Sequence, residues 1–357
     1  MHLNLVYDYG EDIQQDLAYI ERRRYVARAM VPAGYEGYFH DRARFISAHT
    51  STAIEGNPLN AEAAQLVLIH GADADAPSEV ETQNTDLAYE VIGELGLDKS
   101  LKIDQGILRS LNSLLLRGLP GRAAARRGTY RVGGSQIVDA NTRNVRYNPP
   151  PPEWVPELME DLEQNIAEWF VNDSPAVAAA KAHFALISIH PFEDGNGRTA
   201  RLLADLLLHQ TGWSVDGMIS ISSVLLAQRF EYYDALRDTQ GIDFREEVDV
   251  TPFVRFHTKA LARAVGDLED KVVNFNLRKD QLTKTRPDTI NIRQVIGIMY
   301  MVDLGALSST TYSKVCNCSQ PTALSDLQQL VREGHVVRLG AGKSTRYALS
   351  PQVFGGR

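Results

Sequence analysis

The sequence predicts a mainly α-helical protein with one short β-hairpin and a small C-terminal α+β domain. Apolar residues recur at helical spacing through most of the chain up to residue 276. The turn-rich stretch at 128–148 breaks that spacing, and two strand-like runs around a glycine-containing link follow residue 334. A length of 357 residues suits one core of ordinary size and a smaller second domain.

Residues 1–100 are expected to form an N-terminal helical region. Within it, 45–57 contains an apolar-periodic helix that Gly56 stops, with Pro58 just beyond. Further helices are expected at 61–71 and 79–96. These helices alone do not indicate a function.

Residues 101–276 are expected to form the core, which contains the hairpin. Ile137-Val138 and Val145-Arg-Tyr147 flank a turn-rich link at 139–144, so the two runs should pair as short strands. Four consecutive prolines at 149–152 then end the hairpin before a helix around 154–170.

Two apolar helices follow, joined by a tight loop of unusual composition. Ser174 is a suitable N-cap for the first helix, with Pro175 at its first position. The second begins near Thr199, and Gly212 is available as its stop. The loop reads His190-Pro-Phe-Glu-Asp-Gly-Asn-Gly-Arg198.

This loop supplies a base and a metal ligand. An imidazole at the loop entrance, His190, can take a proton from an incoming hydroxyl. The carboxylate of Asp194 is a hard oxygen ligand suited to Mg²⁺ that bridges phosphates. Phe192 is expected to point into the core and anchor the loop.

The end of the loop is suited to binding a phosphate. Unpaired N–H groups at a helix N-terminus attract anions, and Gly195 and Gly197 let the main chain close around phosphate oxygens. The side chain of Asn196 is expected to add an amide donor. Arg198 and Arg201 are three residues apart, on one helix face, and both can reach the same polyphosphate.

The loop resembles the Fic family, whose signature is His-x-Phe-x-Asp/Glu-Gly-Asn-Gly-Arg-x-x-Arg. The family is mainly helical and transfers AMP from ATP to a hydroxyl side chain of a target protein, with Mg²⁺. The resemblance implies that His190 is the general base and Asp194 the metal ligand. It also implies ATP-phosphate contacts by Gly195, Asn196, Gly197, Arg198 and Arg201. Doc-type relatives, which transfer phosphate, usually carry Lys where this chain has Gly197.

A second motif resembles the inhibitory signature Ser/Thr-x-x-x-Glu-Gly/Asn of Fic proteins. Ser51, Glu55 and Gly56 occupy its three defined positions. The resemblance implies that Glu55 pairs with Arg201, and we expect a bidentate bridge that keeps the arginine from the γ-phosphate. A Glu-Gly helix end is ordinary by itself, so this prediction depends on the downstream loop.

The resemblance also assigns the hairpin and the adenine side of the site. It identifies the hairpin at 128–148 as the flap, whose open edge pairs with a target segment. It places Tyr233 and Gln240 against the adenine, with Tyr232 as the alternative, because adjacent tyrosines point to different sides of a helix. The family often has Asn where Gln240 stands.

A polar connector at 277–286 is expected to precede the C-terminal domain, 287–357. Its order of elements resembles the winged-helix fold. We expect helices at 290–304, 309–315 and 319–334 and strands at 335–339 and 344–349. From residue 285 to the end, the sequence contains eight Lys/Arg and four acidic residues. Lys343 and Arg346 of the wing are candidates for phosphate contacts. The third helix offers few cations, so DNA contact and a purely protein-binding role both stay open.

Composition narrows the class of protein. The net charge of −8 argues against general nucleic-acid binding, and no apolar run is long enough to span a bilayer. We expect a cytoplasmic protein, since the N-terminus lacks a basic-then-apolar leader. Cys316 and Cys318 are expected to be free thiols. Dimerisation is common in the family, and the sequence leaves a homodimer open.

The leading hypothesis is an autoinhibited protein adenylyltransferase that modifies a Tyr, Thr or Ser hydroxyl. One alternative is the reverse enzyme, in which Glu55 orients a water that removes AMP from a modified protein. The other is a DNA-binding regulator whose Fic core only senses nucleotide.

Overall fold

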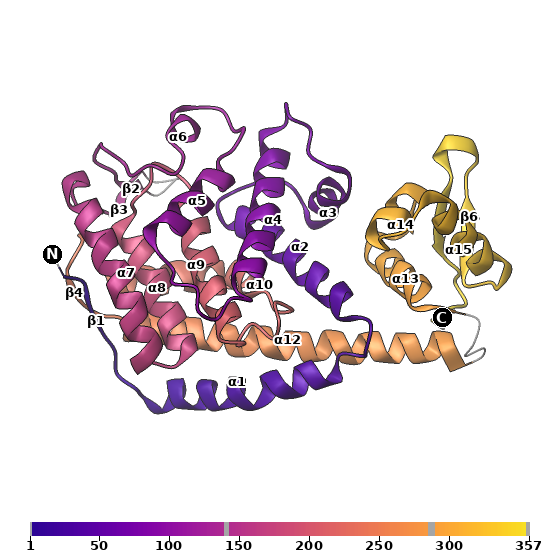
Figure 1. The fold of residues 1–357 in the computed structure, drawn as a ribbon, viewed down its shortest axis with the longest axis horizontal. Helices are drawn as coiled ribbons and strands as arrows, with labels where there is room; N and C mark the ends of the chain where they lie inside the picture. Colours follow the sequence, from indigo (N-terminus) through magenta and orange to yellow (C-terminus); the bar gives the residue numbers. More distant parts are fainter. Residues whose placement is uncertain (1, 139–142, 285–289, 355–357) are drawn as a thin grey trace.

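The fold is helical, elongated and built around a central helix pair (Figure 1). A computed structural model describes residues 2–138, 143–284 and 290–354. Its α-helices are α1 (Glu11–Met30), α2 (Glu36–Ile54), α3 (Ala61–His70), α4 (Pro77–Leu95), α5 (Gln105–Leu115), α6 (Arg122–Ala125), α7 (Val155–Asn172), α8 (Pro175–Ile189), α9 (Asn196–Gln210), α10 (Ile221–Ala227), α11 (Arg229–Gln240), α12 (Thr251–Lys284), α13 (Ile292–Leu304), α14 (Ser309–Val315) and α15 (Gln320–Arg332).

Short strands and two 3-10 turns complete the fold. The strands are β1 (Asn4–Val6), β2 (Ile137–Val138), β3 (Val145–Tyr147), β4 (Glu247–Asp249), β5 (Ala306–Leu307), β6 (Val336–Leu339) and β7 (Arg346–Leu349). The 3-10 turns are η1 (Pro152–Trp154) and η2 (Gly342–Ser344).

Helices α8 and α9 form the centre of the core. Every residue of α8 after Pro175 is buried, and the many alanines of the helix let α7, α9 and α12 pack close to it. The predicted cap is confirmed, because Ser174 Oγ accepts a hydrogen bond from Val177 N at 3.4 Å and Pro175 is the first helical residue. This buried helix gives the loop that follows it a rigid support.

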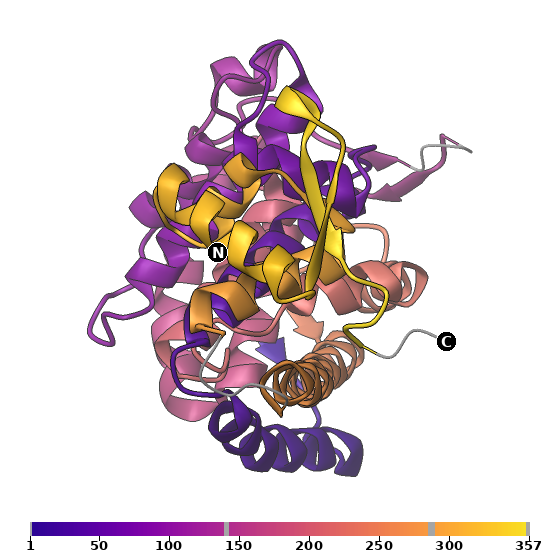
Figure 2. The same cartoon turned by 90° about the vertical axis from the view of Figure 1, so that its right-hand side faces the viewer.

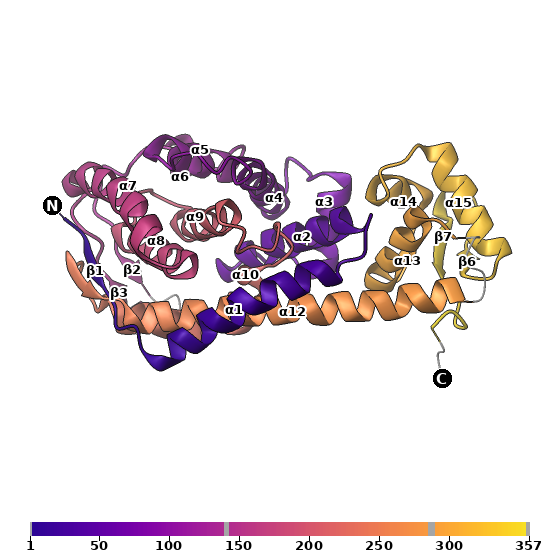
Figure 3. The same ribbon diagram turned by 60° about the horizontal axis from the view of Figure 1, so that its bottom comes forward.

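The longest helix, α12, lies beside α1 and extends under the C-terminal segment (Figures 1 and 3). The predicted helix end at residue 276 is wrong, since the helix continues to Lys284 through most of the predicted connector. Leucine, arginine, lysine and glutamine there are strong helix formers, and Leu282 is buried. Residues 285–286 of the connector lie outside the described residues.

The predicted hairpin forms, and a parallel strand pair accompanies it. Strands β2 and β3 pair antiparallel with Ile137 opposite Tyr147, while residues 139–142 of the predicted link lie outside the described chain. Strand β1 pairs with β4 in parallel, which attaches the N-terminal segment next to the start of α12. That pair was not predicted, because three-residue strands distant in sequence carry no local signal.

The C-terminal segment has the predicted order of helices and strands (Figure 2). Its sheet has a third strand, β5, and the antiparallel order β5-β7-β6. The two residues of β5 were too few to predict. The order suits a winged helix, and that assignment stays a prediction, as does any phosphate contact by Arg346; the Lys343 side chain lies outside the described part of the structure.

The C-terminal segment also contacts α2 and α3. An ion pair joins Arg42 of α2 to Asp303 of α13, with Nη2 and Oδ2 3.1 Å apart. On α3, the main-chain oxygen of Ile69 accepts a hydrogen bond from Lys314 Nζ at 3.0 Å. Helix α2 therefore touches both the core and the C-terminal segment.

Two simpler expectations concern the membrane and the cysteines. Across residues 2–138, 143–284 and 290–354, no helix combines the length and the apolar character needed to cross a bilayer. Cys316 and Cys318 are both free thiols, as predicted.

Candidate active site

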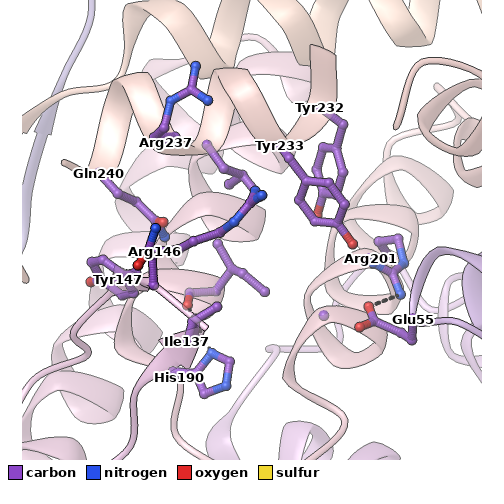
Figure 4. A pocket seen from close by; sticks show the side chains of 14 residues that line it. Glu55, Ile137, Arg146, Tyr147, His190, Arg201, Tyr232, Tyr233, Arg237 and Gln240 are labelled. Carbon is purple, nitrogen blue, oxygen red and sulfur yellow. Dashed lines mark hydrogen bonds and ion pairs between the residues drawn. The ribbon is translucent and has the colours of Figure 1, made fainter. Parts of the chain in front are cut away.

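The loop between α8 and α9 begins with a residue in an unusual conformation. His190 caps α8 with φ 51° and ψ 57°, in the left-handed region that few residues other than glycine adopt. This turn directs its imidazole into a pocket of about 590 Å³ (Figure 4). The pocket is walled by α9, α11, the hairpin and the end of α2.

The imidazole of His190 is set up to act as a base. Burial, and to a lesser degree the nearby guanidinium of Arg131, lower its pKa to about 4, so the ring is neutral at neutral pH. Its Nδ1 lies 3.4 Å from the main-chain oxygen of Ile187, which can only accept a hydrogen bond. The proton therefore belongs on Nδ1, and Nε2 keeps a free lone pair.

Asn196 holds the loop in shape. Its Oδ1 accepts a hydrogen bond from Phe192 N and its Nδ2 donates to Phe192 O, both at 2.9 Å. The side-chain amide is thus bound to its own loop in this structure, and its expected contact with a phosphate stays a prediction. Phe192 is buried at 1% exposure and anchors the loop as predicted.

Two residues that the sequence did not single out join the loop to its surroundings. Asn112 on α5 donates to Asp194 O at 2.8 Å and accepts from Gly128 N at 3.0 Å. Arg131, buried at the base of the hairpin, donates from Nε to His190 O at 2.8 Å and from Nη2 to Pro150 O at 2.5 Å. An asparagine on the apolar face of α5 was a usable signal, whereas nothing in the sequence marked Arg131.

The inhibitory motif lies against the second arginine, as the sequence predicts (Figure 4). Arg201, 2% exposed, donates from Nη2 to Glu55 Oε1 at 2.7 Å. Its Nε donates to Ser51 Oγ and its Nη2 also donates to Ser51 O, both at 2.9 Å. The expected bidentate bridge is wrong, because Glu55 is bound through one oxygen to Nη2 alone, and Nε is bound by Ser51.

The carboxylate of Glu55 is ionised and fits closely against α9. Burial raises its pKa, but the attraction of Arg201 outweighs burial and the pKa is lowered overall. A Cβ placed on Gly197 would overlap Glu55 Oε1, so only glycine there permits this approach. Gly56 ends the motif at φ 100°, a turn that favours glycine.

The far side of the pocket is lined by the residues expected to contact adenine. Tyr233 donates its hydroxyl to Ile54 O at 3.2 Å, and Gln240 donates Nε2 to Ser188 Oγ at 3.0 Å. Tyr232 also lines the pocket, is only 1% exposed, and has its hydroxyl 3.0 Å from His183 Nε2. Of the two adjacent tyrosines, Tyr232 is therefore the core residue.

The predicted metal ligand suits a magnesium ion that arrives with a nucleotide. The side chain of Asp194 is 55% exposed, and its Oδ1 accepts from Gly195 N at 2.6 Å. No group of three or more His, Cys, Asp or Glu side chains capable of holding a metal occurs within the parts of the chain that the structure describes. One carboxylate at a phosphate-binding helix end fits Mg²⁺, which keeps several waters and takes its remaining ligands from substrate phosphates.

A buried helix pair joined by a histidine-bearing loop, with two arginines on the second helix, is the arrangement expected from the Fic signature. Residues 102–208 match the model of the Fic/DOC family. The chain therefore contains a Fic domain at these residues.

Named relatives agree with this class. The chain is 27% identical over 275 residues to protein adenylyltransferase fic-1 of Caenorhabditis elegans, a match that covers 71% of this chain and 47% of that protein. It is 26% identical to protein adenylyltransferase Fic of Nematostella vectensis, covering 62% and 48% of the two chains. The chain thus spans about half the length of these relatives.

Solved structures share the fold. A Fic family protein from Desulfovibrio desulfuricans aligns with a TM-score of 0.63 and 25% identity over 97% of this chain and 98% of that one. Residues 134–508 of Fic-1 from C. elegans align with a TM-score of 0.52 and 20% identity over 75% and 73% of the two chains. The second similarity concerns the fold alone.

Proposed function

We propose that this chain is an autoinhibited protein adenylyltransferase, which transfers AMP from ATP to the hydroxyl of a Tyr, Thr or Ser side chain. One observation carries the proposal: a buried, neutral His190 opens onto the same pocket as Arg201, whose guanidinium is held by Glu55. The relatives named as adenylyltransferases support the reaction class.

In this reaction, His190 Nε2 takes the proton of the target hydroxyl. The oxygen attacks the α-phosphorus of ATP, the bond from that phosphorus to the β-phosphate oxygen breaks, and pyrophosphate leaves. The main-chain N–H groups at the start of α9, together with Arg198, would stabilise the charge that builds on the phosphates. Mg²⁺ bound by Asp194 would supply further charge neutralisation at the phosphates.

Inhibition follows from the position of Glu55. Its carboxylate occupies the donor of Arg201 that the γ-phosphate would use, and it lies against Gly197, where phosphate oxygens would approach the main chain. A γ-phosphate brought to this point would meet a negative charge. ATP would then bind in an unreactive position until the inhibitory helix moves.

The hairpin is the proposed docking site for the target protein. Ile137, Asn144, Arg146 and Tyr147 of the hairpin line the pocket that contains His190. Val138 and Val145 of the same two strands are 42% and 40% exposed. A target segment added to this short sheet by main-chain hydrogen bonds would bring its hydroxyl to the pocket entrance.

Removal of AMP is the second candidate function. Glu55 and His190 line the same pocket, and the Glu55 carboxylate is ionised, so it could orient a water toward the α-phosphorus of an AMP-modified residue. Transfer and removal differ in their need for Glu55, because transfer is inhibited by it and removal requires it.

Intact-protein mass spectrometry after incubation with Mg·ATP tests the proposal. We expect AMP-sized increments in Glu55→Gly but not in the wild type or in Glu55→Gly/His190→Ala. Losing one charge-assisted hydrogen bond favours release about tenfold or more. Increments that persist without His190 would contradict its role as the base, and a Glu55→Gly protein that binds ATP and gains none would contradict transfer. In a parallel experiment, AMP-modified protein is incubated with the wild type or with Glu55→Gly, and the loss of the AMP increment measures removal.

A further inference from the structure

The first catalytic-loop arginine has an acidic partner outside the loop. Arg198, with a side chain 3% exposed, forms an ion pair with Glu81 of α4, and Nη1 and Oε1 are 2.6 Å apart. A second, longer ion pair reaches Asp194 Oδ1 from Nη2 at 3.4 Å. Glu81 is therefore the nearer anion, and it comes from a helix that the loop motif does not include.

The other oxygen of Glu81 binds the inhibitory segment. Asn57, the residue after the Glu55-Gly56 turn, donates from Nδ2 to Glu81 Oε2 at 2.7 Å and to Ser78 O at 2.9 Å. Its Oδ1 accepts from Leu59 N at 3.1 Å, so the amide orientation is fixed by its acceptor side as well. The chain leaving α2 is thus fastened to α4 at the same carboxylate that binds Arg198.

We propose that Glu81 is a positioning residue for Arg198, and that Asn57 couples this positioning to closure of the inhibitory segment. Each oxygen of the Glu81 carboxylate has one partner, and its side chain is 19% exposed. Since the carboxylate is planar and rigid, the position of Asn57 sets the direction in which the other oxygen meets the guanidinium.

The remaining donors of Arg198 indicate what it is positioned for. Its Nε is buried and has no hydrogen-bond partner among residues 2–138, 143–284 and 290–354, and Nη1, although ion-paired with Glu81, makes no hydrogen bond there. A buried charged donor without a partner is costly, so such a donor is expected to gain a ligand when the site is filled. In the proposed reaction, which this inference rests on, that ligand is a phosphate oxygen of ATP.

The inhibitory segment would therefore act on both arginines. Ser51 and Glu55 hold Arg201 directly, while Asn57 reaches Arg198 through Glu81. When the segment retreats, Glu81 loses Asn57 and keeps Arg198 as its partner. Closure of the inhibitory segment and the orientation of the Arg198 side chain are coupled in this way.

Two variants test separately the link from Asn57 to Glu81 and the link from Glu81 to Arg198. Asn57→Ala removes the hydrogen bonds to Glu81 and Ser78 and should raise self-modification about tenfold, the expected effect of losing a hydrogen bond to a charged group. The same change in Glu55→Gly should add less than twofold, because the segment is already released there. Hydrogen exchange of the nucleotide-free Asn57→Ala protein should show faster exchange of the amides at 52–57.

Glu81→Gln tests the positioning of Arg198 in the Glu55→Gly background. Gln has the size of Glu but lacks the charge, so the KM for ATP should rise about fivefold to tenfold, the expected effect of losing one charged partner, while kcat changes less than twofold. Glu94→Gln is the matched control, since Glu94 is exposed on the same helix, and it should leave both constants unchanged.

The outcomes distinguish this inference from the proposed function. A Glu55→Gly protein without any transfer activity would overturn the function. Calorimetry with Mg·ATP would then still test the inference through the affinity of Glu81→Gln. Transfer by Glu55→Gly together with an unchanged KM in Glu81→Gln, or unchanged amide exchange in Asn57→Ala, would overturn the inference.

Discussion

Protonation of His190 should occur near pH 4, far below the usual value for a histidine. The cause is burial of the imidazole, with Arg131 adding to it, while Glu55 and Asp194 act in the opposite direction. The folded protein therefore resists protonation of this ring between pH 6.5 and pH 4, whereas the unfolded chain accepts the proton. This group lowers the stability of the fold as pH falls through that window.

The effect is already large at pH 5. With a pKa of about 4, roughly 90% of His190 is neutral at that pH, against roughly 3% for an unperturbed value of about 6.5. A rate that needs the neutral base would therefore be about 30-fold higher than an ordinary histidine would allow. Between pH 6 and pH 8 the same rate should be flat with respect to His190.

The direct assay is an NMR titration of the nucleotide-free protein, with His190→Ala to assign the signal. Nucleotide is left out of this titration because its phosphate groups titrate near pH 6, and their titration would overlap that of the histidine. The pH dependence of kcat for Glu55→Gly then serves as the second readout, since release of Glu55 by acid cannot contribute in that variant. A midpoint near 6.5 in the titration would refute the view that burial keeps this base neutral.

Three other changes have outcomes set by local packing and hydrogen bonds. Ser51→Ala removes the acceptor of Arg201 Nε and should raise self-modification about fivefold, the equivalent of about 1 kcal/mol, as measured by intact mass; equal rates would show that Ser51 does not hold the arginine. Phe192→Ala should lower the free energy of unfolding by about 3–5 kcal/mol in a denaturant titration, because the ring is 1% exposed; a loss below that range would show that the ring does not anchor the loop. Gly297→Ala would drive a Cβ into the ring of Tyr312 and should destabilise the C-terminal segment by about 1–3 kcal/mol, seen as a lower Tm for that segment; an unchanged Tm would mean that the ring yields without cost.

Most of the helices, the hairpin and the loop could be predicted from the local sequence. The core helix pair was predictable because α8 begins with Ser174-Pro175 and its apolar run is uninterrupted, so the cap and the burial both depend on adjacent residues. The polar and charged residues after Asn276 predict a connector, but they are also helix formers, and α12 continues through them to Lys284. Strands β1 and β5 were missed because each is made only by pairing with a distant strand.

The sequence by itself indicated the Fic domain and, through the resemblance of two motifs to the family, the pairing of Glu55 with Arg201. Only the tertiary structure decided which donors are already occupied. It placed Ser51 on Arg201, Glu81 on Arg198 and the Asn196 amide on its own loop. The contacts of Ser51 and Glu81 join segments more than a hundred residues apart and depend on how the helices pack, whereas the Asn196 contact depends on the folded shape of its loop; composition and periodicity specify neither.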